Sequence, residues 1–314
     1  MMEYRQLGRS GVEVSAFSLG SWLTYEFMAD GDSLAVISRA LEAGVNFLDD
    51  ARYNDRTGHA PVKSGYSEVV FGRLLRKGGW PRSDLIIANK LWYEFYPEES
   101  PEAELDGSLS RLQLDYLDLV YCVPPPPSLP VAEMVQQMDA LIKTGKVRQW
   151  GILNWTTAQI AEAWQAATTD GLTSPCAAQL AYSLLNRSEV EGAGTQELLQ
   201  KMGVGIVASY SLHGGLLTGK YNQAGAGDNG RFTPENIEAM RQKALLEKVG
   251  QVIALAQEVG CTPAQLALAY CLKNPQVSSV LFGSTKIAQV EENIQTLQIL
   301  PLNDQEMMAK LHSL

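Results

Sequence analysis

The stretch Gly44-Val-Asn-Phe-Leu-Asp-Asp-Ala51 is a short apolar run that ends in two aspartates. Two later runs have the same form. Ile86-Ile-Ala-Asn-Lys90 ends in a lysine, and Asp118-Leu-Val-Tyr-Cys-Val123 ends in a valine that directly precedes a run of prolines. Runs of this length are typical of β-strands, and each is followed by a longer segment with the apolar spacing of a helix.

The same alternation of strand-length runs and helical segments continues along the chain. The expected strands are Val14–Leu19, Asn46–Asp49, Leu85–Ala88, Leu117–Tyr121, Val147–Gly151, Ala177–Leu180, Val204–Ser209 and Ser278–Phe282. The expected helices are Leu34–Ala43, Ser67–Arg76, Ala103–Leu112, Val131–Ile142, Ala158–Ala167, Thr195–Lys201, a long one near Asn236–Val259, one that begins at Thr262 and Pro263, and Ile287–Leu297. Because parallel strands need helical crossovers, this order predicts an α/β protein with a (β/α)8 TIM barrel. With 314 residues, the chain suits one such barrel, so residues 1–314 are expected to form a single domain.

Composition excludes several classes of protein. The formal net charge of −10 argues against a nucleic-acid partner, which usually requires a basic surface. No apolar run approaches the roughly 20 residues that cross a bilayer, so membrane insertion is not expected. The N-terminus lacks the regions of a signal peptide, and the four cysteines are scattered, which predicts free thiols and a cytoplasmic protein. The three histidines lie far apart and there is no CxxC pair, so no metal site is expected.

The quoted runs and the order of elements resemble the aldo-keto reductase superfamily, and most closely its branch that contains the β subunits of voltage-gated potassium channels. The resemblance spans roughly residues 3–300. It implies a (β/α)8 barrel that passes a hydride from NADPH to a carbonyl. It also implies an N-terminal β-hairpin at the bottom of the barrel, here Arg5–Gly8 followed by Val12–Glu13.

The resemblance implies a catalytic set of which two members are replaced here. In the family an aspartate, a tyrosine five residues later, a lysine and a histidine cooperate; the tyrosine donates the proton and the lysine lowers its pKa. Asp49 and Lys90 match the aspartate and the lysine, and they are expected to form an ion pair. Asn54 occupies the tyrosine position, with Tyr53 one place early, and Val123 occupies the histidine position.

The sequence leaves the replacement proton donor open. Tyr53 can take the role if a bulge shifts the loop. An insertion, Asp55-Arg-Thr-Gly-His-Ala-Pro-Val-Lys-Ser64, is longer than the family's usual loop and lies beside the vacated position. It brings His59 and, directly after it, Tyr66, so either can supply the missing group. An ordinary surface loop is the alternative.

The resemblance also implies residues that hold NADP(H). Asn154 and Gln179 match the strand-end residues that bind the nicotinamide amide. The run from Tyr210 to Tyr221 matches the loop over the pyrophosphate, because glycine lets backbone N–H groups approach phosphate oxygens. The positions carried over from that loop are Leu212, Gly214, Leu216 and Lys220, and Arg231 is a further candidate pyrophosphate ligand.

The segment after the last strand resembles the family's adenosine 2′-phosphate site, which lies at a helix N-terminus. The matching positions are Gly283, Thr285, Lys286, Gln289, Glu292 and Asn293. Lys286 adds a positive charge that favours NADPH over NADH. Trp22 is expected among the cofactor contacts, and with Tyr25, Trp92 and Trp155 it can form a wall of the substrate pocket.

Three functions agree with these residues. The preferred one is an NADP-dependent oxidoreductase that acts on a carbonyl or alcohol substrate with an atypical catalytic set. The alternatives are an NADPH-binding regulatory subunit with little or no turnover and a redox-neutral enzyme that retains NADP. The expected pair of Asp49 and Lys90 favours chemistry, because a purely structural barrel has no need to bury a charged pair at its mouth. A homo-oligomer is possible, and the substrate and the direction of reaction are left open.

Overall fold

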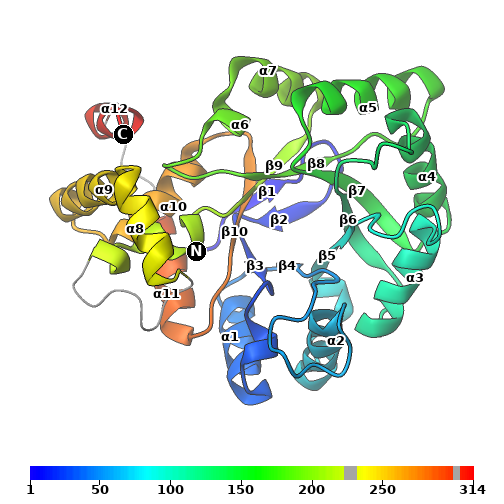
Figure 1. Ribbon diagram of the computed structural model, residues 1–314, viewed down its shortest axis with the longest axis horizontal. Coiled ribbons are helices and arrows are strands. Elements are labelled where there is room, and N and C mark those ends of the chain that lie inside the picture. Colours follow the sequence, from blue (N-terminus) through cyan, green and yellow to red (C-terminus); the bar gives the residue numbers. More distant parts are fainter. Residues whose placement is uncertain (223–231, 300–304) are drawn as a thin grey trace.

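The computed structural model describes residues 1–222, 232–299 and 305–314 (Figure 1). A closed barrel of eight parallel strands lies at its centre, surrounded by helices. The barrel strands are β3 (Phe17–Gly20), β4 (Phe47–Asp49), β5 (Ile86–Leu91), β6 (Leu117–Cys122), β7 (Val147–Leu153), β8 (Ala177–Ala181), β9 (Gly205–Ser209) and β10 (Val277–Phe282). The barrel closes because β10 pairs in parallel with both β3 and β9. The predicted (β/α)8 barrel is confirmed.

An antiparallel hairpin, β1 (Tyr4–Gln6) and β2 (Glu13–Ser15), covers the amino-terminal end of the barrel, as predicted. Arg5 Nη1 donates to the Val277 carbonyl at 2.7 Å, and Ser278 Oγ donates to the Gln6 carbonyl at 2.8 Å. Both partners lie at the start of β10, so the hairpin is fixed to the bottom of the barrel. The opposite end, where the strands finish, stays available for a site.

Helices follow the barrel strands. They are α1 (Asp30–Glu42), α2 (Tyr66–Gly78), α3 (Pro101–Leu112), α4 (Val131–Lys143), α5 (Thr157–Asp170), α6 (Ser188–Glu191), α7 (Ala193–Met202), α8 (Pro234–Gln242), α9 (Leu245–Val259), α10 (Pro263–Lys273), α11 (Ile287–Ile299) and α12 (Gln305–His312). Short 3-10 turns are η1 (Tyr25–Phe27), η2 (Arg82–Asp84), η3 (His213–Thr218) and η4 (Lys220–Asn222). Thr262 caps α10 as predicted, with its hydroxyl accepting from the Gln265 N–H.

One predicted helix is wrong. The segment near Asn236–Val259 forms two helices, α8 and α9, because Ala244 adopts a left-handed backbone with φ of 55°. Helices α6 and α12 were not predicted from the sequence.

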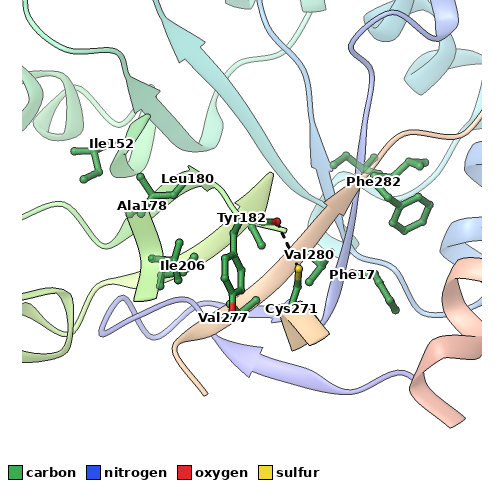
Figure 2. Close-up of a cluster of buried hydrophobic side chains, with 14 of the residues drawn as sticks. Phe17, Ile152, Ala178, Leu180, Tyr182, Ile206, Cys271, Val277, Val280 and Phe282 are labelled. Atoms are coloured by element: carbon green, nitrogen blue, oxygen red, sulfur yellow. Dashed lines mark hydrogen bonds between the residues drawn. The ribbon is translucent and has the colours of Figure 1, made fainter. Parts of the chain in front are cut away.

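Alternate residues of each strand face two different cores. One core fills the barrel interior and includes Phe47, Leu119 and Tyr121, together with Leu7 of the hairpin. The other packs the outer faces of the strands against the helices. Figure 2 shows part of this outer core, where Phe17 of β3 meets Phe282 of β10 edge to face, with ring centroids 5.6 Å apart. This alternation follows from the two-residue period of a strand.

Within the described ranges, no single helix is long and apolar enough to cross a membrane. One bent pair, α9 with α10 at 89°, passes that test only when the two helices are taken together. The four cysteines are free thiols, as predicted.

Candidate active site

Two buried side chains, Asp49 and Lys90, and the half-buried Tyr53 lie together at the carboxyl ends of β4 and β5. Lys90 Nζ donates to Asp49 Oδ1 at 2.5 Å and lies 3.2 Å from the hydroxyl oxygen of Tyr53. Asp49 and Lys90 are only 2% and 3% exposed. The second carboxylate oxygen of Asp49 accepts from Gln179 Nε2 at 3.0 Å. The ion pair expected between Asp49 and Lys90 is therefore present, and Tyr53 is the hydroxyl beside it.

The surroundings of this group set its protonation. Burial alone would lower the pKa of Lys90, but Asp49 and Tyr53 outweigh it, so the pKa lies above the ordinary value. Burial raises the pKa of Tyr53 above the ordinary value, although the Lys90 ammonium opposes that rise. At neutral pH the lysine is charged and the phenol keeps its proton. The group therefore holds a proton that Tyr53 can donate.

A tight turn brings Tyr53 to this place. The Tyr53 N–H donates to the Ala51 carbonyl at 2.8 Å, a three-residue turn of the γ type. The Tyr53 carbonyl accepts from the Gly65 N–H at 2.9 Å, which ties both ends of the insertion together. Asn54, in the position where the family has its tyrosine, is exposed and forms an isolated bridge with Ser64. The tyrosine that is one place early in sequence is therefore the one that contacts Lys90.

The two other candidate donors lie elsewhere. Asp55 accepts from the backbone of Thr57 and Gly58, and this turn leaves His59 exposed with its Nδ1 3.0 Å from the Thr57 carbonyl. Tyr66 is the first residue of α2 and packs half-buried against the outer core. Neither residue lines the pocket at Tyr53.

A pocket of about 400 Å³ opens above the Tyr53 ring. Its lining consists of Trp22, Arg52, Tyr53, Asn54, Arg56, Trp92 and Glu94. The centroids of Trp22 and Trp92 lie 6.4 and 6.1 Å from that of Tyr53. Two of the aromatics named in the sequence analysis thus form walls of the pocket. Arg52 and Glu94 were not predicted from the sequence to line the pocket; the position of Arg52 directly before Tyr53 was the available signal.

Asp50 directly follows Asp49 in the chain and contacts Lys90 through its backbone carbonyl. It is fully buried; its Oδ1 accepts from Ser21 Oγ, and its Oδ2 has no hydrogen-bond partner among the described residues. Its backbone carbonyl accepts from Lys90 Nζ at 3.2 Å. Burial, and then the charge of Glu68, raises the pKa of Asp50 well above the ordinary value. This carboxyl adds no second negative charge while it is protonated.

The position of the family's histidine is apolar. Val123 follows β6, is half-buried and packs against both cores. Trp92 lines the adjoining pocket, and its buried indole Nε1 has no hydrogen-bond partner among the described residues. The Val123 side chain cannot make the hydrogen bond that a histidine would make there.

The two residues expected at the nicotinamide lie together. Gln179 is buried at the end of β8, and its carbonyl accepts from the Asn154 N–H at 3.1 Å. Asn154 follows β7, is exposed and has a positive φ of 56°. Their side chains stand at the carboxyl ends of neighbouring strands, and that of Gln179 contacts Asp49. This arrangement fits a planar amide held beside the Asp49–Lys90 pair.

The loop after β9 contains a run of left-handed glycines. Gly214 has φ of 66°, and a methyl group added to it would come within 2.6 Å of the Phe232 ring. Leu212 is half-buried, whereas Leu216 is fully buried in the outer core and can offer only its backbone. Lys220 is exposed, with its ammonium over the Tyr221 ring. Arg231, the remaining candidate of this region, lies outside the described residues.

The turn before α11 offers a second place for an anion. Gly283, Thr285, Lys286 and Gln289 are exposed, and the Thr285 N–H donates to Gln289 Oε1 at 2.9 Å. The Ser284 hydroxyl is buried without a hydrogen-bond partner in the described part of the chain. Helix N-termini favour anions, so this set fits a phosphate.

Two residues of the same motif are turned inward. Asn293 is buried, and Glu292 is half-buried with its carbonyl accepting from Gln265 Nε2. Taken together, the residues at the barrel mouth fit NADP(H). No group of three or more metal-binding side chains occurs in the described ranges.

The fold and the site define a parallel α/β barrel whose mouth holds a buried aspartate–lysine pair beside a half-buried tyrosine. The model of the aldo/keto reductase family matches residues 16–313, so the chain belongs to that family.

Two curated relatives are similar over almost their whole length. A protein of Oryza sativa subsp. japonica named "Probable voltage-gated potassium channel subunit beta" is 36% identical, over 99% of this chain and 96% of the relative. A protein of Arabidopsis thaliana with the same name is 35% identical, over 96% of this chain and 93% of the relative.

Proposed function

We propose that this protein is an NADP-dependent oxidoreductase that acts on a carbonyl or alcohol substrate in the pocket above Tyr53. The observation that carries the proposal is the Tyr53 hydroxyl, 3.2 Å from the ammonium of buried Lys90. When bound, NADPH supplies the hydride. Asn154 and Gln179 would hold its amide, the backbone around Gly214 its pyrophosphate, and Lys286 its 2′-phosphate.

The chain's own residues divide the proton transfer among them. Tyr53 donates its phenolic proton to the carbonyl oxygen as that oxygen gains negative charge. The Lys90 ammonium then stabilises the phenolate, and Asp49 keeps Lys90 charged and in place. Trp92 Nε1 can donate to the same carbonyl oxygen, which would replace the orienting bond that Val123 cannot make. In the oxidation of an alcohol the same groups act in reverse.

The names of the two relatives favour a second candidate, an NADPH-binding regulatory subunit with little turnover. Buried ionisable groups argue for chemistry, because burying a charged pair is costly unless it is well compensated. We also propose a cytoplasmic location, supported by the free thiols.

Single-turnover absorbance measurements on NADPH-loaded protein distinguish these candidates. We expect oxidation of the bound NADPH on mixing with a panel of aldehydes and quinones. A complete lack of oxidation, with NADPH binding established by calorimetry, would favour the regulatory role. Substrate conversion without net use of NADPH would indicate a redox-neutral enzyme.

A further inference from the structure

A buried arginine borders the substrate pocket. Arg52 lines the pocket, yet its side chain is only 6% exposed. Its Nη1 donates to Glu99 at 2.8 Å, and its Nη2 lies 3.1 Å from Glu104 and 4.0 Å from Glu94. Nη2 is therefore ion-paired with Glu104, whereas Nε makes no hydrogen bond within the described residues. Because a guanidinium presents five donors in a rigid fork, part of this fork is unfilled.

A second arginine borders the same pocket. Arg56 is exposed in the insertion, and the described residues offer it no ion pair. Its position is held by the loop, since the N–H of neighbouring Asp55 donates to the Lys63 carbonyl at 2.7 Å. The insertion therefore presents a positive charge at the pocket rim.

Aromatic side chains form much of the remaining pocket wall. The rings of Trp22, Tyr53 and Trp92 form its walls, and its volume is near the lower end for small-molecule sites. Glu94 also lines it and would repel an excess of negative charge. The lining suits a small flat body with one negative charge in preference to a dianion.

We propose that the substrate is a small, flat carbonyl compound that carries one carboxylate. The guanidinium groups of Arg56 and Arg52, which both line the pocket, bind the carboxylate, and the carbonyl lies at Tyr53. This inference rests on the proposed function: the hydride comes from NADPH and the proton from Tyr53, so the carbonyl becomes an alcohol while the carboxylate is unchanged.

A pair of matched aldehydes tests this inference. 4-Carboxybenzaldehyde has the charge, and methyl 4-formylbenzoate has nearly the same shape without it. The measured quantity is the ratio of kcat/KM for the acid to kcat/KM for the ester. We expect a ratio above one that Arg56→Gln lowers about tenfold, equivalent to about 1.4 kcal/mol.

Two further variants sharpen the test. Glu94→Gln removes a repelling charge, so it should raise the ratio about threefold. Lys63→Gln removes an exposed charge from the same loop without touching the pocket lining, so it should leave the ratio as in the wild type. A ratio at or below one, or an equal fall in Arg56→Gln and Lys63→Gln, would overturn the inference.

The failure of the proposed function would look different. If neither aldehyde is reduced, binding alone tests the inference. The Kd from quenching of tryptophan fluorescence should be at least tenfold lower for benzoate than for benzamide. Arg56→Gln should abolish that difference. Equal binding of the two compounds would overturn the carboxylate site itself.

Discussion

The substitution Tyr53→Phe tests the site most directly. It removes one oxygen atom, the one 3.2 Å from Lys90 Nζ, and keeps the ring between Trp22 and Trp92. General acid catalysis is worth on the order of 10²–10⁴ in rate, so we expect hydride transfer to slow by that factor. Lys90 keeps its bonds to Asp49 and to the Asp50 carbonyl, so unfolding should become easier by only about 1 kcal/mol.

The assay is the single-turnover oxidation of bound NADPH by an excess of aldehyde, with NADPH affinity measured by calorimetry. Affinity should change less than about twofold, since the hydroxyl acts on the transition state. Tyr66→Phe and His59→Ala are the controls, and both should keep the wild-type rate because neither residue lines the pocket. If Tyr53→Phe retains nearly full activity while either control variant loses it, the proton comes from His59 or Tyr66, and the assignment of Tyr53 as the proton donor is wrong.

Three other predictions concern the charges around the site. Lys90→Met leaves Asp49 buried and unpaired, which should cost about 3–5 kcal/mol in urea denaturation, and adding Asp49→Asn should recover more than half of it. Because the pKa of Asp50 is raised by burial and by Glu68, the folded state binds a proton there that the unfolded state has lost above about pH 4. The free energy of unfolding of the wild type should therefore fall with rising pH, by up to about 1.4 kcal/mol per pH unit, until the pH passes the pKa of Asp50 in the folded protein. Urea midpoints measured between pH 5 and 8 should fall less steeply in Asp50→Asn. Lys286→Glu should raise the Kd for NADPH about tenfold in calorimetry and change that for NADH much less, since only NADPH has the 2′-phosphate.

The barrel could be predicted from the sequence because its strands are uninterrupted apolar runs. β6 begins at Leu117 as predicted, whereas β5 begins at Ile86, one residue later than predicted, and ends at Leu91, three residues later than predicted. The division between α8 and α9 could not be predicted, because it depends on Ala244 in a left-handed conformation that alanine rarely adopts. Tertiary packing, not local propensity, decides such a break.

The Asp49–Lys90 pair was also predictable, and strand register explains why. Asp49 is paired with Ala88 of β5, and Lys90 lies two residues further along that strand. Residues two apart on a strand share a face, so both side chains enter the barrel mouth. The place of Tyr53 was left open because it depends on the turn at Ala51, for which a sequence gives no clear signal.

The same turn explains why losing the family's tyrosine position does not remove the hydroxyl. The backbone directs residue 53 toward Lys90 and residue 54 to the rim, where Asn54 pairs with Ser64. A tyrosine placed at position 54 should therefore not reach the lysine. In the double variant Tyr53→Phe with Asn54→Tyr, we expect hydride transfer as slow as in Tyr53→Phe alone. Recovery of the wild-type rate would show that the insertion rearranges freely, and the hydroxyl's position would then depend on which tyrosine is available and not on the turn.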